Sequence, residues 1–193
     1  MPTETQESEV DDSDFPKARA KFYELIGHCI TLYQGLEDYL PAVFAAAIGG
    51  STDRAHAIFA PYRGLEAKLE GITAAISDGD QGSCDRWERL RPLIRAASEA
   101  RGKIAHASVL HQGGGHTVTL DQETKVVTVR RTAKSRMELR KSQKGTELVW
   151  DNDKLFEEYG RIEHARRLSI GLVRRLTGQP VPPHLDDDPP GSP

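Results

Sequence analysis

The chain has 193 residues and a mass of 21.3 kDa, and its 26 basic residues face 29 acidic ones, giving a formal net charge of −3. This length suits one domain with some decoration, and 37% hydrophobic residues with only 2 cysteines exclude collagen-like, disulfide-scaffold and wholly disordered proteins. The longest strictly apolar run, residues 42–48, is far shorter than the roughly 20 residues of a membrane span. The acidic N-terminus lacks the apolar stretch of a secretory signal, so we expect a cytoplasmic protein without membrane association.

The charges are distributed unevenly along the chain. Residues 1–14 carry six acids and no base, and residues 178–193 add three acids among many prolines. Such segments bury too little apolar surface to offset their ordering entropy, so we expect disordered tails at 1–14 and 178–193. The intervening domain, 15–177, holds all 26 bases against the other 20 acids, a net charge of +6. A basic body permits a polyanionic partner.

The first half of this domain predicts two amphipathic segments. Apolar residues recur every seven positions between residues 14 and 48, which indicates a long helix that Pro41 should kink or divide. A second helical stripe begins after the capping residues 51–53 and ends near Ile76. Pro61 and Gly64 are expected to interrupt its beginning.

The second half predicts two more helices around a β-insertion. A helical stripe runs from about Ser83 to about Ser108 and is followed by the glycine run 113–115. Alternating polar and β-branched residues then predict one hairpin from 116–120 and 125–131, and a second from 137–141 and 146–150. A final helix should begin at Asp151 or Asn152 and end at Leu176. The predicted fold is therefore all-α, a four-to-five-helix up-down bundle with a small antiparallel β-hairpin insertion at about 116–150.

Metal and cofactor sites are not indicated. The chain has no Cys-x-x-Cys motif, and the spacing of five between His106, His111 and His116 does not stack ligands on one helix face. Cys29 and Cys84 are interpreted as reduced thiols in the core. We therefore expect neither a metal nor another cofactor.

The segment Glu99–Ser108, EARGKIAHAS, carries the strongest chemical signal. It places Arg101 and His106 at the end of the third predicted helix. Arginine is a permanent cation whose planar fork matches phosphate oxygens, and histidine can take and give protons near neutral pH. The pair therefore suits metal-free cleavage of an RNA phosphodiester, with His106 as general acid or base and Arg101 holding the charge that grows on phosphorus.

Helix geometry limits how these two residues can cooperate. Five residues along a straight helix correspond to a rotation of about 140°, so their side chains do not share a face. They can converge only if the helix ends at His106 or if a second copy of the chain lines the same cleft.

With this motif the chain resembles the HEPN superfamily of small helical-bundle proteins, whose signature is an Arg, four to six residues and a His late in a core helix. The matching residues are Arg101-Gly-Lys-Ile-Ala-His106, and Leu36-Glu37-Asp38-Tyr39-Leu40 in the first helix is similar to a family element. The resemblance spans about Phe15 to Leu176. It implies a symmetric homodimer with both Arg–His pairs in one cleft, acting as a metal-independent ribonuclease in toxin–antitoxin, anti-phage or stress systems.

Alternative interpretations remain open beside this one. Family members commonly have a polar residue, often Asn, after the motif arginine, whereas this chain has Gly102, which favours a catalytically inactive dimeric module that binds a partner protein or nucleic acid. An antitoxin is the possible protein partner if the chain is a toxin. Arg101 can instead pair with Glu37, which would orient the arginine or simply tie two helices together. His106 can be a C-terminal capping residue. No dedicated motif supports a small-molecule enzyme.

A basic run between residues 125 and 144 contains eight bases and one acid, Glu138. It is either the solvated face of an exposed sheet or a platform for RNA phosphates, whose binding would weaken steeply with salt. The run lacks the paired aromatic residues of a base-stacking surface, so recognition of a particular RNA sequence is not indicated. The candidate RNA-binding residues are Arg130, Arg131, Lys134, Arg136, Arg140 and Lys141.

Overall fold

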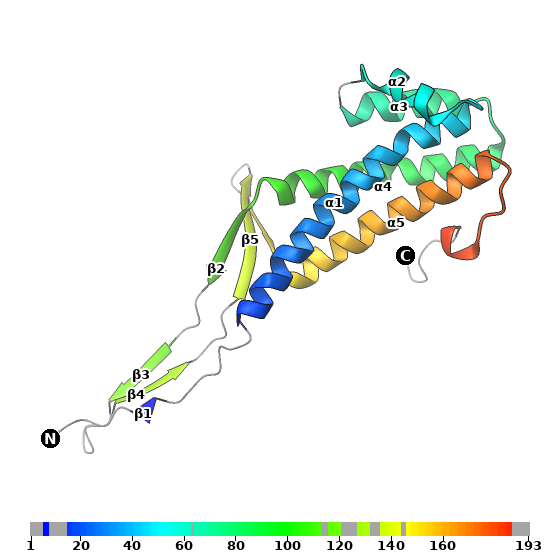
Figure 1. Cartoon of the computed structure of the whole chain (residues 1–193). Helices are drawn as coiled ribbons and strands as arrows, with labels where there is room; N and C mark the ends of the chain where they lie inside the picture. Colours follow the sequence, from blue (N-terminus) through cyan, green and yellow to red (C-terminus); the bar gives the residue numbers. More distant parts are fainter. Residues whose placement is uncertain are drawn as a thin grey trace.

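The computed structural model describes residues 6–7, 15–62, 64–112, 116–120, 127–131, 136–143 and 146–186. Within these ranges the chain is a mainly helical bundle with a smaller β part. The α-helices are α1 (Phe15–Ala47), α2 (Thr52–Phe59), α3 (Leu65–Ile76), α4 (Gln81–Ala105) and α5 (Asn152–Leu176). The long helices α1, α4 and α5 lie side by side, with α4 antiparallel to the other two, and α2 and α3 lie at the end where α1 finishes (Figure 1).

The first two predicted segments become three helices. Helix α1 runs through Pro41 without a break, because Leu40 just before the proline and Val43 two residues after it are fully buried in the core and hold the helix in place. The second segment divides into α2 and α3 around Pro61 and Gly64, as the sequence predicts. Gly64 has a φ of 97°, a conformation that favours glycine, so the break is built into the backbone.

Capping side chains set where α4 and α5 begin. The carboxylate of Asp80 accepts the backbone N–H of Ser83 at 3.0 Å and the Ser83 hydroxyl at 2.6 Å, so α4 begins at Gln81, two residues before the predicted start. Asp151 accepts the backbone N–H of Lys154 at 3.0 Å, which confirms the predicted start of α5.

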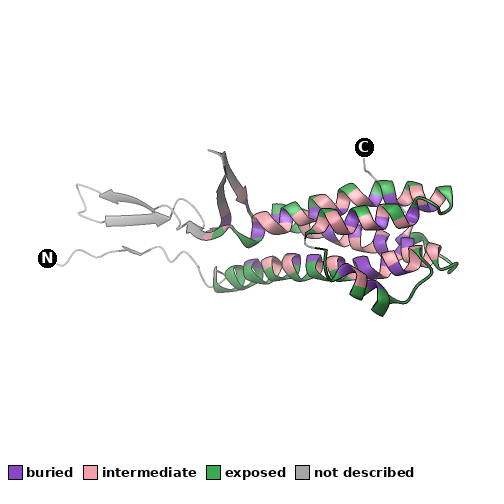
Figure 2. Cartoon of the chain, turned by 90° about the horizontal axis from the view of Figure 1, so that it is seen from above, coloured by how far each residue is buried: buried purple, intermediate pink, exposed green. Residues whose placement is uncertain are grey.

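The core lies where the three long helices face one another and extends under α3. Figure 2 shows the buried residues on the facing sides of these helices. Trp87 of α4 anchors this core, with its indole N–H donating to the Thr73 hydroxyl of α3 at 2.8 Å. The other large side chains that are fully buried are Phe22, Leu36, Leu40, Leu69, Ile72, Ile76, Leu90, Ile94, Ile104, Leu139 and Leu155.

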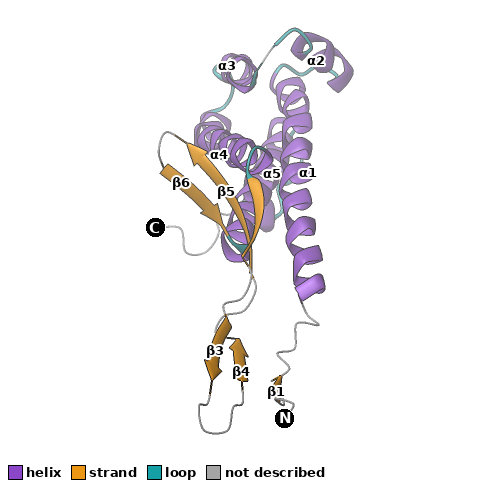
Figure 3. Ribbon diagram, turned by 90° about the vertical axis from the view of Figure 1, so that its left-hand side faces the viewer, coloured by secondary structure: helices purple, strands orange, loops and turns teal. Residues whose placement is uncertain are grey.

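Both predicted hairpins are present in the β part (Figure 3). Strand β3 (His116–Leu120) pairs antiparallel with β4 (Val127–Arg131), and β5 (Arg136–Gln143) pairs antiparallel with β6 (Thr146–Trp150). The sequence did not predict β2 (Ser108–Gln112), which follows α4 and pairs antiparallel with β5, from Ser108 opposite Arg140 to Gln112 opposite Arg136. Helix α4 therefore ends at Ala105, before the predicted end, because the next residues join a sheet.

The two predicted tails differ from the expectation where the structure describes them. Gln6–Glu7 form β1, which pairs parallel with β4, and the rest of 1–14 lies outside the described residues. At the other end, the 3₁₀ helix η1 (Pro183–Leu185) packs against α5, and Leu185 is buried. The ordered domain thus continues to Asp186, beyond the boundary predicted at Leu176–Gly178, because one apolar side chain in the acidic tail finds a place in the core. Residues 187–193 lie outside the described part.

Candidate functional site

Helix α4 carries Arg101 on its last full turn, next to the buried residues Ala100 and Ile104. This position leaves the guanidinium partly exposed, at the edge of the contact between α4 and α1. Among the described residues it forms no hydrogen bond or ion pair. A partly buried cation without a protein anion is suited to bind an anionic ligand.

The positive charge of Arg101 acts on the hydroxyl of Tyr33 in α1. Its ring is buried, and burial is the main reason why the pKa of its hydroxyl is raised, with the Glu37 charge contributing in the same direction. A hydrogen bond with Ser98 and the positive charge of Arg101 oppose this rise. Tyr33 and Ser98 therefore form a neutral, protonated polar pair beside Arg101. Neither residue was singled out by sequence reasoning, because the pair spans two helices.

The carboxylate of Glu37 does not pair with Arg101, as one interpretation of the sequence expected. It accepts a hydrogen bond from the Lys68 ammonium of α3 at 2.7 Å, in an ion pair whose side chains are 26% and 21% exposed. The reason lies in the helix packing: α3 lies against α1 on the side that carries Glu37, so Lys68 reaches the carboxylate first. Glu37 thus contributes negative charge near Tyr33 but no contact to Arg101.

His106 lies one residue beyond the end of α4. It is the C-cap of that helix, with a φ of −108° and a ψ of 9°, and its side chain is exposed. The chain then enters β2 at Ser108, so the end of the helix is fixed by the sheet that follows. This is the capping position that the structural interpretation of the residue expected, and it leaves the imidazole open to solvent and to a ligand.

Arg101 and His106 do not contact each other within the described part of the chain. No hydrogen bond or ion pair joins them there, which agrees with the rotation expected between positions five residues apart. Between them, Gly102 is a helical glycine at which an added Cβ would meet nothing within 4 Å. The surface between the two motif residues is therefore open and lacks a polar side chain at the position after the arginine.

The structure positions only part of the predicted basic platform. Arg130 and Arg131 belong to β4, and Arg136 and Lys141 to β5, but their side chains, like Lys134 as a whole, lie outside the described residues. Arg140 is described: its guanidinium donates to one Glu138 oxygen from Nε at 3.0 Å and from Nη2 at 2.8 Å. Glu138 is 4% exposed, so the charge of Arg140 is balanced by a buried acid of its own strand.

A second cluster of arginines was missed by sequence reasoning. Arg86 and Arg89 of α4 line a small pocket with Leu168 of α5 and Asp186 of the C-terminal segment. Positions 86 and 89 share a helix face, which the sequence indicates, but the contact with Asp186 depends on the folding of a tail that composition predicts to be disordered. The apolar Leu185 beside Asp186 is the signal that could have predicted it.

Two features are absent from the residues that the structure describes. No helix in this part of the chain combines the length and apolar character of a membrane span. The same residues contain no group of three or more His, Cys, Asp or Glu side chains placed to hold a metal ion. Comparisons of the chain with models of known protein families, with curated proteins and with solved structures find no match.

Proposed function

We propose that the protein is a metal-independent endoribonuclease of HEPN type. The observation that carries this proposal is the presence of a guanidinium and an imidazole near the end of α4. Arg101 is a partly buried guanidinium without an anionic partner among the described residues, and His106 is an exposed imidazole at the helix terminus. A fixed cation and a proton carrier are the two groups that phosphodiester cleavage needs when no metal takes part.

The reaction in this proposal is an internal transfer of the phosphoryl group. His106 accepts the proton of the ribose 2′-hydroxyl while the 2′-oxygen forms a bond to phosphorus, and the bond from phosphorus to the 5′-oxygen breaks. A proton returns to the leaving 5′-oxygen from the imidazolium of the second copy. The products are a 2′,3′-cyclic phosphate and a 5′-hydroxyl end. Arg101 holds the charge that grows on the phosphoryl oxygens, and the protonated pair of Tyr33 and Ser98 adds no competing anion at that place.

This scheme places two copies of the chain at one cleft. Within one chain, His106 is the C-cap of α4, and even there no hydrogen bond or ion pair joins it to Arg101 among the described residues. A symmetric homodimer brings Arg101 of one copy toward His106 of the other and supplies both proton carriers. The dimer is therefore part of the proposal.

Cleavage of a mixed RNA pool by purified protein in EDTA tests the proposal. Arg101→Ala and His106→Ala are compared with the matched surface variants Arg161→Ala and His56→Ala, which replace exposed residues of α5 and α2. We expect cleavage that survives chelation, persists in both control variants and falls at least 100-fold in both site variants. Site variants that fold and cleave like the wild type would contradict the proposal.

A second candidate function is a non-catalytic binding module of the same architecture. It is favoured by Gly102, which has no polar side chain at the position after Arg101, and by exposed aromatic residues of α5 and α1, Phe156 at 67% and Tyr23 at 47% exposure. In this case the wild type should cleave no RNA under any condition. The His106→Ala protein should retain a bound protein or nucleic acid as firmly as the wild type does.

A further inference from the structure

The C-terminal segment 179–186, here called the C-terminal strap, crosses the outside of α5 and ends against α4. Its 3₁₀ helix buries Leu185 to 8% exposure. The backbone N–H of Leu185 donates to the Pro182 carbonyl and that of Asp186 donates to the Pro183 carbonyl, both at 2.9 Å. The strap therefore lies on the bundle in a defined conformation and brings the Asp186 carboxylate to a fixed place.

A glycine of α5 makes this approach possible. Gly171 is buried, and a Cβ added there would lie 2.2 Å from the Leu185 carbonyl oxygen and 3.2 Å from its carbonyl carbon. Both atoms belong to the backbone, so no rotation of a side chain could relieve the contact. Position 171 is thus a seat for the strap that only glycine allows.

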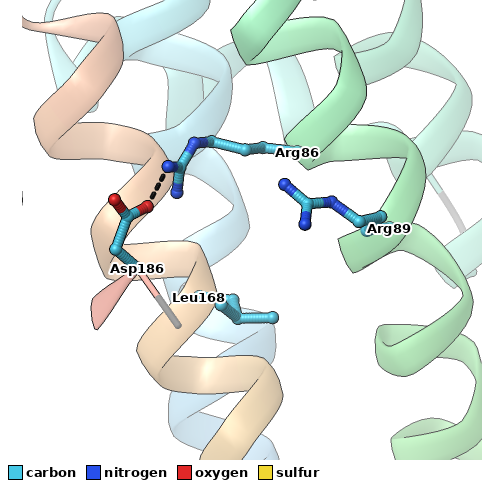
Figure 4. A pocket seen from close by; sticks show the side chains of 4 residues that line it. All are labelled: Arg86, Arg89, Leu168 and Asp186. Carbon is cyan, nitrogen blue, oxygen red and sulfur yellow. Dashed lines mark ion pairs between the residues drawn. The ribbon is translucent and has the colours of Figure 1, made fainter. Parts of the chain in front are cut away.

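The strap places an acid on a cluster of arginines. Asp186 forms an ion pair with Arg86, whose side chain is 18% exposed, and Arg89 lies beside them on the wall of the same pocket (Figure 4). Burial is the main cause that lowers the pKa of Arg86, and the positive charges of Arg175 and Arg89 lower it further. The Arg175 guanidinium forms an ion pair with the Asp80 carboxylate, with Nη2 and Oδ1 3.1 Å apart. The site is therefore a cationic pocket in which Arg86 is largely buried and Arg89 is exposed, so that an anion brought beside Arg86 is favourable.

We propose that the Arg86–Arg89 pocket is a binding site for a phosphate group and that the C-terminal strap occupies it with Asp186 as an internal substitute. A carboxylate on a guanidinium presents two oxygens in the same way as a phosphate does, and arginine forks match both. Release of the strap frees the Arg86 guanidinium beside the exposed Arg89, and its return closes the site. Apparent affinity for phosphate is then reduced by the fraction of molecules in which the strap is closed.

This pocket is separate from the site at Arg101. The 15 residues between Arg86 and Arg101 correspond to about 22 Å along α4, so one phosphate cannot contact both. Phosphate binding at the Arg86–Arg89 pocket does not depend on ribonuclease activity, so it can be tested independently.

Gly171→Ala is the variant that opens the site, and Gly160→Ala is its matched control. Both substitutions add one methyl group to α5, but a Cβ at Gly160 meets nothing within 4 Å. Hydrogen exchange of residues 179–186 measures strap release, calorimetry with inorganic pyrophosphate measures binding of a free phosphate, and fluorescence anisotropy with a labelled single-stranded RNA measures binding of a phosphodiester. All are made on the full chain.

We expect faster exchange of the strap in Gly171→Ala than in Gly160→Ala and about tenfold tighter binding of at least one of the two probes. The probe that responds identifies the source of the phosphate. Arg86→Ala placed in the Gly171→Ala protein should remove the gain. If hydrogen exchange of residues 179–186 is unchanged in Gly171→Ala, Gly171 is not what allows the strap to dock. Faster exchange without tighter binding, or an equal gain for a polyglutamate peptide, would overturn the phosphate site.

Discussion

Gly102 is the residue at which the catalytic interpretation is easiest to test. A side chain placed there has room, because an added Cβ would meet nothing within 4 Å. If the ribonuclease proposal holds, Gly102→Asn should raise the rate of RNA cleavage by about tenfold, since a polar group beside the arginine can hydrogen-bond to the reacting phosphate. Initial cleavage rates in EDTA are the measurement.

Gly102→Ala is the control for that variant, because it gives the same backbone effect without a polar group. Alanine in a helix interior is favoured over glycine by about 0.5–1 kcal/mol, so both variants should unfold at a higher temperature than the wild type or close to it. Equal cleavage rates in the Asn and Ala variants would show that the position plays no part in the chemistry.

Cys29 predicts a loss of stability at alkaline pH. Its thiol is fully buried and donates to the Leu155 carbonyl at 3.6 Å, and burial, with the Glu158 charge as a lesser cause, raises its pKa from 9.0 to about 11. The folded state therefore holds the proton more tightly than the unfolded state does. Its contribution to stability is complete below pH 9 and is lost by about 1.4 kcal/mol per pH unit as the pH rises from 9 to about 11.

Urea unfolding at pH 8, 9, 10 and 11 measures this effect, with Cys29→Ala as the control. The variant is less stable at every pH because a buried side chain is shortened, but its stability should fall less steeply above pH 9. Parallel pH profiles for the two proteins would mean that the thiol titrates alike in the folded and unfolded states.

At the scale of single residues, the sequence indicates two candidate residues at a helix end but not the side chains that surround them. Arg101 and His106 are recognisable because both belong to one short segment at a predicted helix end. The Glu37–Lys68 ion pair and the Tyr33–Ser98 pair each join residues of two helices, so they depend on how α1 packs against α3 and α4. The spacing of residues in one helix does not show which side chain of a neighbouring helix will contact them.

At the scale of elements, the start of α4 rests on one capping residue. Asp80 receives two hydrogen bonds from Ser83, and Arg175 of α5 donates to the same carboxylate at 3.1 Å. These contacts, with those of Ser83 first, hold the pKa of Asp80 at about 2, below its usual 3.8. The stabilising effect is therefore present above pH 3.8 and is lost as the pH falls through about 2.

Thermal unfolding of Asp80→Ala and Asp80→Asn separates the two roles of this residue. Asparagine keeps an N-cap acceptor but loses the charge that attracts Arg175, whereas alanine loses both. We expect melting temperatures that fall in the order wild type, Asn variant, Ala variant at pH 7, and a smaller acid-induced drop in both variants. An Ala variant that melts with the wild type would show that the cap is dispensable.

The boundary between α4 and β2 shows where the element prediction failed. Both hairpins were predicted because alternating residues and turn formers are local signals. The predicted helix reaches Ser108, the first residue of β2, since Ile104 and Ala105 continue the apolar stripe of α4. Pairing with β5, which begins 24 residues after β2 ends, decides between helix and strand at these positions, and local sequence does not contain that information.

At the scale of the whole molecule, the apolar stripes of the helices predict the helical bundle. They do not predict that the C-terminal strap docks on its outside. The strap was expected as part of a disordered tail because prolines and acids dominate its composition. One apolar residue, Leu185, and one glycine, Gly171, are enough to dock it, and they lie on different elements. Composition averages over a segment, whereas docking depends on two particular residues.

The proposed dimer makes a further prediction for the α1–α5 face. Phe156 is 67% exposed and its ring stacks on Tyr159 at 6.3 Å between centroids, beside a hollow that also receives Leu25 and His28 of α1. Phe156, Tyr159 and Leu25 together form an apolar patch, and exposed apolar patches mark interaction surfaces. Phe156→Glu should therefore convert a dimer into a monomer of 21.3 kDa in analytical ultracentrifugation.

Tyr62→Glu is the matched control, because Tyr62 is also an exposed aromatic residue, 39% accessible, but follows α2 at the other end of the bundle. It should leave the dimer intact. Since the cleavage scheme needs Arg101 and His106 from different copies, Phe156→Glu should lose RNA cleavage together with the dimer, while Tyr62→Glu keeps both. A monomeric Phe156→Glu protein that still cleaves RNA at the wild-type rate would show that one copy completes the site, and the motif would then have to act within a single chain.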